Sequence, residues 1–264
     1  MRVEVGSGVG IAVHELGAGP PVVLVPGFGF DHRVWDRQVR VLTEAGRRVV
    51  CVDQRGHGDS DKPLAGYSVE ELARDLGAVL DAVLDGPCTL VGWSFAGQVG
   101  FRLAAERPDL VARLALVCSN GVRATRSDDF PFGGKPADLE RLMVEAERAD
   151  RIAARRTAIT PGFAAAPDPA LVDWLVGISL AMPSWSAVAC HRAMLHADLV
   201  ADIPRVTQPV LQLVGAADPV FSARGARWLA ERLADTRLVE LADCGHYPLF
   251  ERPTEFDEAL LGFV

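Results

Sequence analysis

The sequence lacks an excess of positive charge, and this limits the partners that it can attract. Its 264 residues include 27 basic and 35 acidic side chains, which gives a formal net charge of −8 at pH 7. Only Lys62 and Lys135 are lysines. Nucleic acids and anionic membrane surfaces bind basic faces, so we expect neither as a partner.

Long hydrophobic runs and closely spaced cysteines are also missing. No stretch of about 18 apolar residues occurs, so a membrane-spanning helix is not expected. The N-terminal Met1–Gly6 is not followed by the apolar segment of a secretory signal. The cysteines are too scattered to predict a disulfide framework or a zinc site: Cys51, Cys88, Cys118, Cys190 and Cys244. We therefore expect a cytoplasmic protein with reduced thiols.

The sequence does contain the proportions of hydrophobic and charged residues that are typical of a globular protein. Its apolar runs and helical patterns alternate regularly along the chain. Hydrophobic residues make up 49% and charged residues 23% of the chain, which allows a substantial core. Short apolar runs alternate with helical patterns, and this alternation predicts a parallel sheet covered by helices on both faces. An antiparallel hairpin is expected at residues 2–16. The predicted strands are Val22–Val25, Val49–Val52, Thr89–Val91, Leu114–Val117, Val210–Val214 and Leu238–Leu241.

One segment, residues 122–203, interrupts the alternation with helical signals alone. Asp168 followed by Pro169 is typical of a helix start, and Ser184 is a candidate cap for a further helix. We interpret the segment as a helical cap over the sheet, with residues 1–121 and 204–264 as the core domain. The alternative is one ordinary but long crossover connection.

Ser94 follows a predicted strand directly and precedes a predicted helix. A serine hydroxyl needs exposure and a neighbouring base to act as a nucleophile, and a sharp strand-to-helix turn provides the exposure. Such a turn requires small side chains two residues before and after the serine, where the sequence has Gly92 and Ala96. By itself this short pattern fits a buried structural serine equally well.

A second strand ends in the glycine-rich run Pro26-Gly27-Phe28-Gly29. Acyl transfer builds negative charge on a carbonyl oxygen, and backbone N–H groups can stabilise that charge. The amides of Phe28 and Phe95 are the candidate oxyanion hole. No Gly-Lys-Ser/Thr follows either glycine cluster, which argues against a phosphate-binding loop.

Asp218 and His246 follow the last two predicted strands. A histidine in a loop is usually only a solvated or hydrogen-bonded side chain, but the chain order serine, acid, histidine changes this interpretation. This order is that of a Ser-His-Asp catalytic triad on a parallel sheet. We therefore predict Ser94, Asp218 and His246 as the catalytic residues.

With these motifs in place, the chain resembles α/β-hydrolases of the serine esterase, lactonase and cofactor-free haloperoxidase type. The resemblance implies a mostly parallel eight-stranded sheet with helices on both faces and a helical cap inserted after the sixth strand. Within it, the segment around His57 shapes a turn and is not assigned to catalysis, and Trp35 packs in the core. The motifs are Pro26-Gly27-Phe28-Gly29, Asp53-Gln54-Arg55-Gly56-His57-Gly58-Asp59-Ser60, Ser94, Gly215 with Asp218, and Gly245-His246 with Pro248.

The resemblance implies a carboxylic ester hydrolase that cleaves an ester or lactone bond of a small, hydrophobic substrate, with no cofactor and no metal. Alternatives on the same triad are carbon–carbon cleavage of diketones and haloperoxidase or perhydrolase chemistry. A non-catalytic ligand-binding protein is the alternative from another class. Relatives with an aspartate nucleophile are excluded by Ser94. The expected substrate-binding residues are Gly27, Gly29, Trp93 and Trp185, and the oligomeric state stays open.

Overall fold

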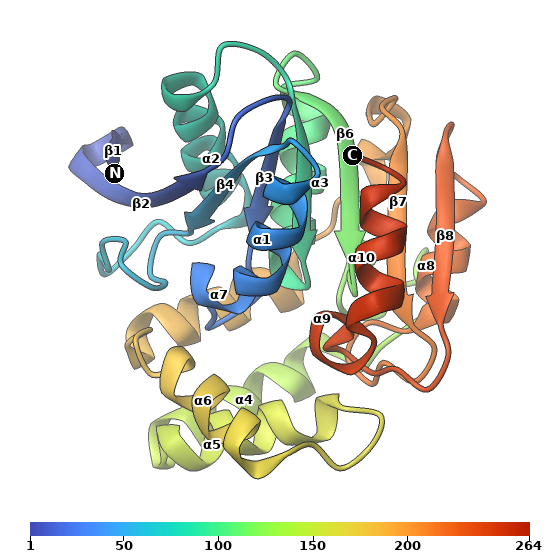
Figure 1. Ribbon diagram of the computed structural model, residues 1–264. Coiled ribbons are helices and arrows are strands. Elements are labelled where there is room, and N and C mark those ends of the chain that lie inside the picture. The colour runs from blue at the N-terminus through green and yellow to red at the C-terminus, as the bar shows by residue number, and fades with distance from the viewer.

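The computed structural model describes residues 1–264, except for the side chain of Ser7. Within this part, eight strands form one sheet in the order β1-β2-β4-β3-β5-β6-β7-β8 (Figure 1). β2 runs antiparallel to both of its neighbours, and the other neighbouring strands are parallel. The predicted fold class is thereby confirmed. The strands are β1 (Arg2–Val5), β2 (Val9–Leu16), β3 (Pro21–Val25), β4 (Arg48–Asp53), β5 (Cys88–Trp93), β6 (Val111–Val117), β7 (Val210–Gly215) and β8 (Thr236–Leu241).

Helices cover both faces of the sheet, as the nearly continuous apolar strands predict. α1 (Asp36–Glu44) and α10 (Pro253–Leu261) pack on one face, and α2 (Val69–Val83) and α3 (Phe95–Glu106) pack on the other (Figure 1). Successive strand side chains point to opposite faces, so Leu24 enters one core and Val25 the other. The remaining helices of the C-terminal part are α8 (Ala223–Ala230) and α9 (Pro248–Glu251).

Local signals in the sequence explain where several helices begin. Ser68 and Glu71 form the reciprocal hydrogen bonds of a capping box, and α2 starts directly after Ser68. Trp35 is completely buried at the end of the short 3-10 helix η2 (His32–Trp35), as expected of a core residue. All five cysteines are free and buried.

A group of helices follows β6 and precedes β7 in the chain. These helices extend beyond the carboxyl ends of the strands (Figure 1). Asp168 caps its third helix by accepting a hydrogen bond from the Ala170 N–H, as expected. Ser184 does not cap the fourth: Pro183 occupies the cap position, and the Ser184 hydroxyl donates instead to the buried Glu147. The helices are α4 (Pro136–Ala149), α5 (Arg151–Ile159), α6 (Pro169–Ser179) and α7 (Ser184–His196), with η3 (Thr160–Gly162) and η4 (Val200–Arg205).

A helix that spans a membrane must be both long and strongly apolar. Within the described part of the chain, no single helix meets both requirements. Only α6 and α7 together do so, and these two helices are bent by 98° at the break between them.

Candidate active site

Ser94 lies at the apex of a sharp turn between β5 and α3. Its backbone has φ 57° and ψ −121°, a strained conformation for a residue with a side chain. The turn brings Gly92 so close to the following helix that a Cβ on Gly92 would lie 2.6 Å from the Ala96 carbonyl oxygen. Glycine is therefore required at position 92, whereas the turn accommodates the buried methyl group of Ala96.

The loops after β7 and β8 bring Asp218 and His246 to this serine. The His246 Nε2 lies 2.9 Å from the Ser94 Oγ, and the His246 Nδ1 lies 2.9 Å from the Asp218 Oδ2. The Asp218 Oδ1 also accepts the backbone N–H groups of Val220 and Phe221, at 2.7 and 3.0 Å. These two bonds fix the carboxylate, which leaves its other oxygen to orient the imidazole.

The His246 loop is attached both to the sheet and to the inserted helices. The Trp93 Nε1–H donates to the His246 carbonyl at 3.0 Å, and the His246 N–H donates to the Gly162 carbonyl at 2.7 Å. Gly162 belongs to η3, within the inserted helices. A shift of the inserted helices would therefore move the histidine that contacts Ser94.

The glycine-rich loop after β3 lies against Ser94. A Cβ on Gly27 would be 3.0 Å from the Cβ of Ser94, so the loop backbone approaches the serine closely. The Phe28 amide is the next one along this loop. The Phe95 N–H belongs to the first turn of α3, where backbone donors have no partner within the helix. In the described residues, neither amide hydrogen-bonds to another group of the chain.

A pocket of about 110 Å³ opens beside Ser94 and His246. Loops at the strand ends form one side of it, and α4, α5, α6 and α7 form the other. Two of the four expected substrate-binding residues line it: Gly27 and Trp93. The other lining residues are Phe28, Phe30, Met143, Arg155, Ala158, Ile159, Ser179, His191, Met194, Val220 and Tyr247.

The other two expected substrate-binding residues lie outside this lining. Trp185 is in the first turn of α7, where its Nε1–H donates to the Lys62 carbonyl. The residue is 50% exposed to solvent. The prediction for Trp185 is therefore corrected: the ring covers the loop after β4, not the pocket. Gly29 has φ +79°, and a Cβ there would lie 3.2 Å from Arg155 and 3.4 Å from Ser179, two residues that line the pocket.

Two polar residues in the pocket were not anticipated from the sequence. Arg155 is only 3% exposed and pairs with Glu147 through two hydrogen bonds of 2.9 Å. His191 stacks on the Phe28 ring at 4.0 Å between centroids, and burial lowers the pKa of His191 to about 4. Their signal in the sequence is a charged or polar residue within an otherwise apolar helix pattern, which by itself does not separate a pocket from a core.

His57, in the segment after β4, is completely buried, and burial lowers its pKa to about 4. Its Nδ1 lies 3.0 Å from the Arg55 carbonyl oxygen, so the ring fixes the turn in which it lies. This position agrees with the expectation that His57 has an architectural role.

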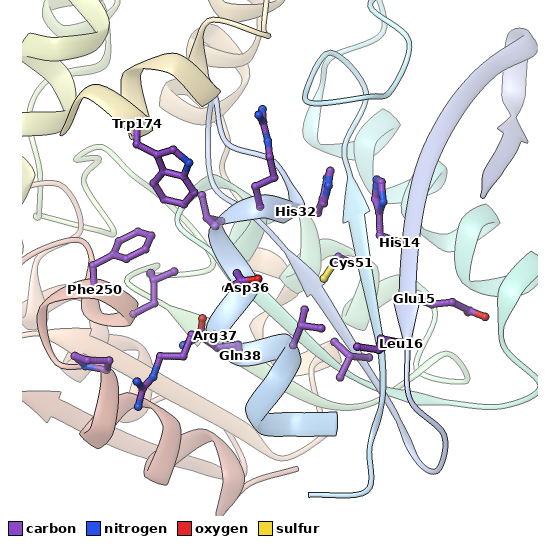
Figure 2. Close-up of a pocket in the computed structure, with 16 residues that line it drawn as sticks. His14, Glu15, Leu16, His32, Asp36, Arg37, Gln38, Cys51, Trp174 and Phe250 are labelled. Atoms are coloured by element: carbon purple, nitrogen blue, oxygen red, sulfur yellow. The ribbon is translucent and has the colours of Figure 1, made fainter. Parts of the chain in front are cut away.

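A larger groove of about 720 Å³ lies on another part of the surface (Figure 2). Its labelled side chains come from β2, η2, α1, β4, α6 and α9, and Ser94, Asp218 and His246 do not line it. Size alone therefore does not locate the candidate site, because the smaller pocket is the one that Ser94 and His246 line.

Comparison with known proteins agrees with this architecture. Residues 22–259 match the model of the alpha/beta hydrolase family, and the chain belongs to this family. A pimeloyl-[acyl-carrier protein] methyl ester esterase from Nitrosomonas europaea is 32% identical over 250 residues, covering 93% of this chain and 96% of that relative.

Two solved structures are also similar. An esterase from Exiguobacterium antarcticum superimposes with a TM-score of 0.96 at 25% identity, covering 99% of this chain and 98% of that one. An enol-lactonase from Burkholderia xenovorans LB400 superimposes with a TM-score of 0.88 at 25% identity, covering 100% and 99%. The protein is an enzyme of the hydrolase class.

Proposed function

We propose that the protein is a serine hydrolase that cleaves an ester or lactone bond of a small, mainly apolar substrate. The observation that carries the proposal is the chain of two 2.9 Å contacts from Ser94 through His246 to Asp218. The family relationship to esterases and an enol-lactonase supports the same chemistry.

In the proposed reaction, the Ser94 Oγ attacks the carbonyl carbon while the His246 Nε2 takes the hydroxyl proton. The negative charge that develops on the carbonyl oxygen is stabilised by the Phe28 and Phe95 N–H groups. His246 then donates its proton to the leaving alcohol. Water attacks the carbonyl of the acyl-enzyme while His246 takes a proton from it, and His246 returns this proton to the Ser94 Oγ as the acid is released. Asp218 keeps the imidazole in the required tautomer throughout.

The pocket supports the proposed substrate class. Its volume of about 110 Å³ suits a small acyl group, and most of its lining side chains are apolar or aromatic. The inserted helices form one side of this pocket, so we further propose that residues 122–203 act as the cap domain on a core of residues 1–121 and 204–264.

The test is hydrolysis of a panel of p-nitrophenyl esters of increasing acyl length, a set of lactones and a β-diketone, with Ser94→Ala as the control. We expect the short esters or the lactones to be cleaved, and the Ser94→Ala variant to lose about 10⁶-fold in kcat. Cleavage of the diketone alone would replace the proposal by carbon–carbon hydrolysis. Binding of the compounds without turnover would favour a ligand-binding protein.

A further inference from the structure

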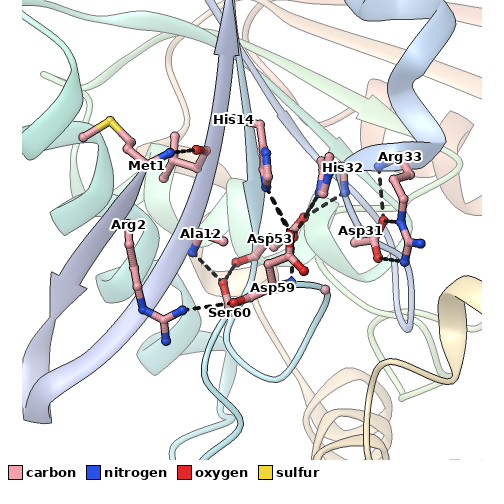
Figure 3. A network of polar contacts seen from close by, with 12 residues as sticks. Met1, Arg2, Ala12, His14, Asp31, His32, Arg33, Asp53, Asp59 and Ser60 are labelled. Atoms are coloured by element: carbon pink, nitrogen blue, oxygen red, sulfur yellow. Dashed lines mark hydrogen bonds and ion pairs between the residues drawn. The ribbon is translucent and has the colours of Figure 1, made fainter.

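Two histidines and two aspartates gather on the side of the molecule that carries the larger groove (Figure 3). Three segments distant in the chain contribute to this histidine–aspartate cluster. His14 comes from β2, His32 begins η2, Asp53 ends β4 and Asp59 lies in the following loop. Each offers one ligand atom, and these four atoms lie within 4.8 Å of one another.

The distances within the cluster approach those of a coordination shell. The Asp53 Oδ2 lies 3.1 Å from the His32 Nδ1 and 3.9 Å from the His14 Nε2. The His14 Nε2 lies 3.7 Å from the Asp59 Oδ2. Four ligands at zinc-bond lengths of about 2.0–2.1 Å form a tetrahedron with edges of about 3.3–3.4 Å. The two His14 distances exceed these edges by about 0.3–0.6 Å, so the side chains must draw together when an ion binds.

Asp53 is positioned independently of any ion. Its carboxylate is fully buried and accepts the backbone N–H groups of His32 at 2.7 Å and of Asp59 at 3.0 Å. Both bonds come from the segments that carry the other ligands. A ligand held in this way lowers the cost of assembling a site.

The charges around Asp53 are unbalanced in the described residues. Its ion-pair partners there are the two histidines, His14 and His32, while the nearby Arg33 pairs with Asp31. The His14 Nε2 is enclosed and has no hydrogen-bond partner among the described residues. The two imidazole rings stack at 3.5 Å between centroids beside the same carboxylate (Figure 3). An imidazole binds a metal ion in the plane of its ring, so one ring must turn out of this stack for both to bind one ion. The Asp53 carboxylate already has partners, whereas the enclosed His14 nitrogen requires one, and an ion would supply it.

We propose that the histidine–aspartate cluster binds one divalent transition-metal ion of the zinc type. Imidazole nitrogens and carboxylate oxygens together select such an ion over Mg²⁺ and Ca²⁺, which prefer oxygen ligands only. The ion connects β2, η2 and the loop after β4. His14 and His32 also line the groove of Figure 2, so the site is reached from its surface.

The experiment uses the full-length protein, freed of metal with EDTA and titrated with ZnCl₂ by calorimetry. Zinc retained after gel filtration is then counted by mass spectrometry. We expect one zinc ion per chain in the wild type. The double variant His14→Ala/His32→Ala should bind zinc at least about 100-fold more weakly. Loss of a residue that only supports a ligand weakens metal binding by about 10–100-fold, and loss of two ligands should weaken it more.

Two further variants identify the site. His196→Ala removes an exposed histidine that contacts the Glu140 carboxylate, and it should bind zinc like the wild type. His246→Ala removes a ligand from the other group that could bind an ion, Cys118 with Asp218 and His246, and it should also retain zinc. Absence of binding in the wild type, unchanged affinity in the double variant, or loss in His246→Ala would each overturn the proposal.

A spectroscopic measurement on the wild type covers the case in which the double variant does not fold. X-ray absorption at the zinc edge should show nitrogen and oxygen neighbours, including the scattering pattern of two imidazoles, and no sulfur. A sulfur neighbour would place the ion at a cysteine and contradict the proposal.

Discussion

At the scale of single residues, Gly92 provides the space that the turn at Ser94 needs. Because a Cβ at position 92 would lie 2.6 Å from the Ala96 carbonyl oxygen, Gly92→Ala must move either β5 or α3. We expect this variant to lose most of its hydrolytic activity and about 1–3 kcal/mol of stability, the usual cost of overpacking. Activity on a cleaved ester and urea denaturation measure the two effects.

The matched change is Ala96→Gly, on the other side of the serine. It removes a buried methyl group without adding any atom to the turn, and it produces the more common Gly-X-Ser-X-Gly pattern. We expect activity close to that of the wild type. A larger loss in Ala96→Gly than in Gly92→Ala would contradict the steric explanation.

Substitution of two buried histidines tests which of them is the general base. His246 contacts the Ser94 Oγ, whereas His57 contacts the Arg55 carbonyl. We expect His246→Gln to lower kcat by about 10⁴-fold or more, the order of a triad loss. His57→Asn keeps an amide donor for the Arg55 carbonyl and should leave kcat within a few-fold, provided that circular dichroism shows a folded protein. The reverse pattern would move the base to His57.

At the scale of elements, α4 to α7 shape the pocket without carrying Ser94, Asp218 or His246. Met143 on α4 lines the pocket, while Trp185 on α7 covers the loop after β4. We expect Met143→Ala to change the relative kcat/KM for short and long acyl chains by about 1–3 kcal/mol, the scale of one pocket contact.

The control for this prediction is Trp185→Ala, which removes a larger apolar side chain from the same group of helices. We expect Trp185→Ala to leave the ratio between acyl chains unchanged, whatever it does to stability. A change of selectivity in Trp185→Ala but not in Met143→Ala would show that the pocket has been placed wrongly.

The sequence was sufficient to predict the strands and the positions of Ser94, Asp218 and His246, because each of these residues follows a strongly apolar run at a turn. It was not sufficient for the contacts of the inserted helices α4 to α7. Residues in α7 contact the core on one side and the cap helices on the other, so apolar side chains on this helix do not indicate which face forms the pocket. The misplacement of Trp185 has this cause. The Ser184 cap was wrong because α7 begins one residue earlier than expected, with Pro183 at the cap position.

Contacts between side chains of different elements could not be predicted from the sequence either. Arg155 and Glu147 belong to successive helices, and nothing in their spacing indicates that both are buried. The histidine–aspartate cluster draws on three segments, which come together because β4 pairs with β2 on one side and with β3, the strand before η2, on the other. Such contacts depend on the tertiary arrangement, and periodicity reports only one element at a time.

At the scale of the whole molecule, two histidines buried in the neutral form make stability depend on pH. Burial lowers the pKa of His57 and of His191 to about 4, from a reference value of 6.5. As the pH falls from about 6.5 to about 4, the unfolded chain takes up protons that the folded chain does not. The free energy of unfolding therefore falls through this window by up to about 1.4 kcal/mol per pH unit for each histidine.

Urea denaturation at a series of pH values measures this dependence. Carboxylates contribute their own slope at low pH, so the informative quantity is the difference between the wild type and His57→Asn, which has no imidazole at that position. We expect the variant to have a shallower slope between about pH 6.5 and pH 4. Identical slopes would mean that His57 is protonated in the folded protein as readily as in the unfolded chain.

The most direct test of the central claim, that Ser94 is an activated nucleophile, is covalent labelling with a fluorophosphonate probe followed by peptide mass spectrometry. An ordinary serine hydroxyl does not react, and one activated by a neighbouring base does. We predict a single adduct on the peptide that contains Ser94, complete loss of labelling in Ser94→Ala, and strongly slowed labelling in His246→Gln. Labelling at another serine, or no labelling of the folded wild-type protein, would contradict the account.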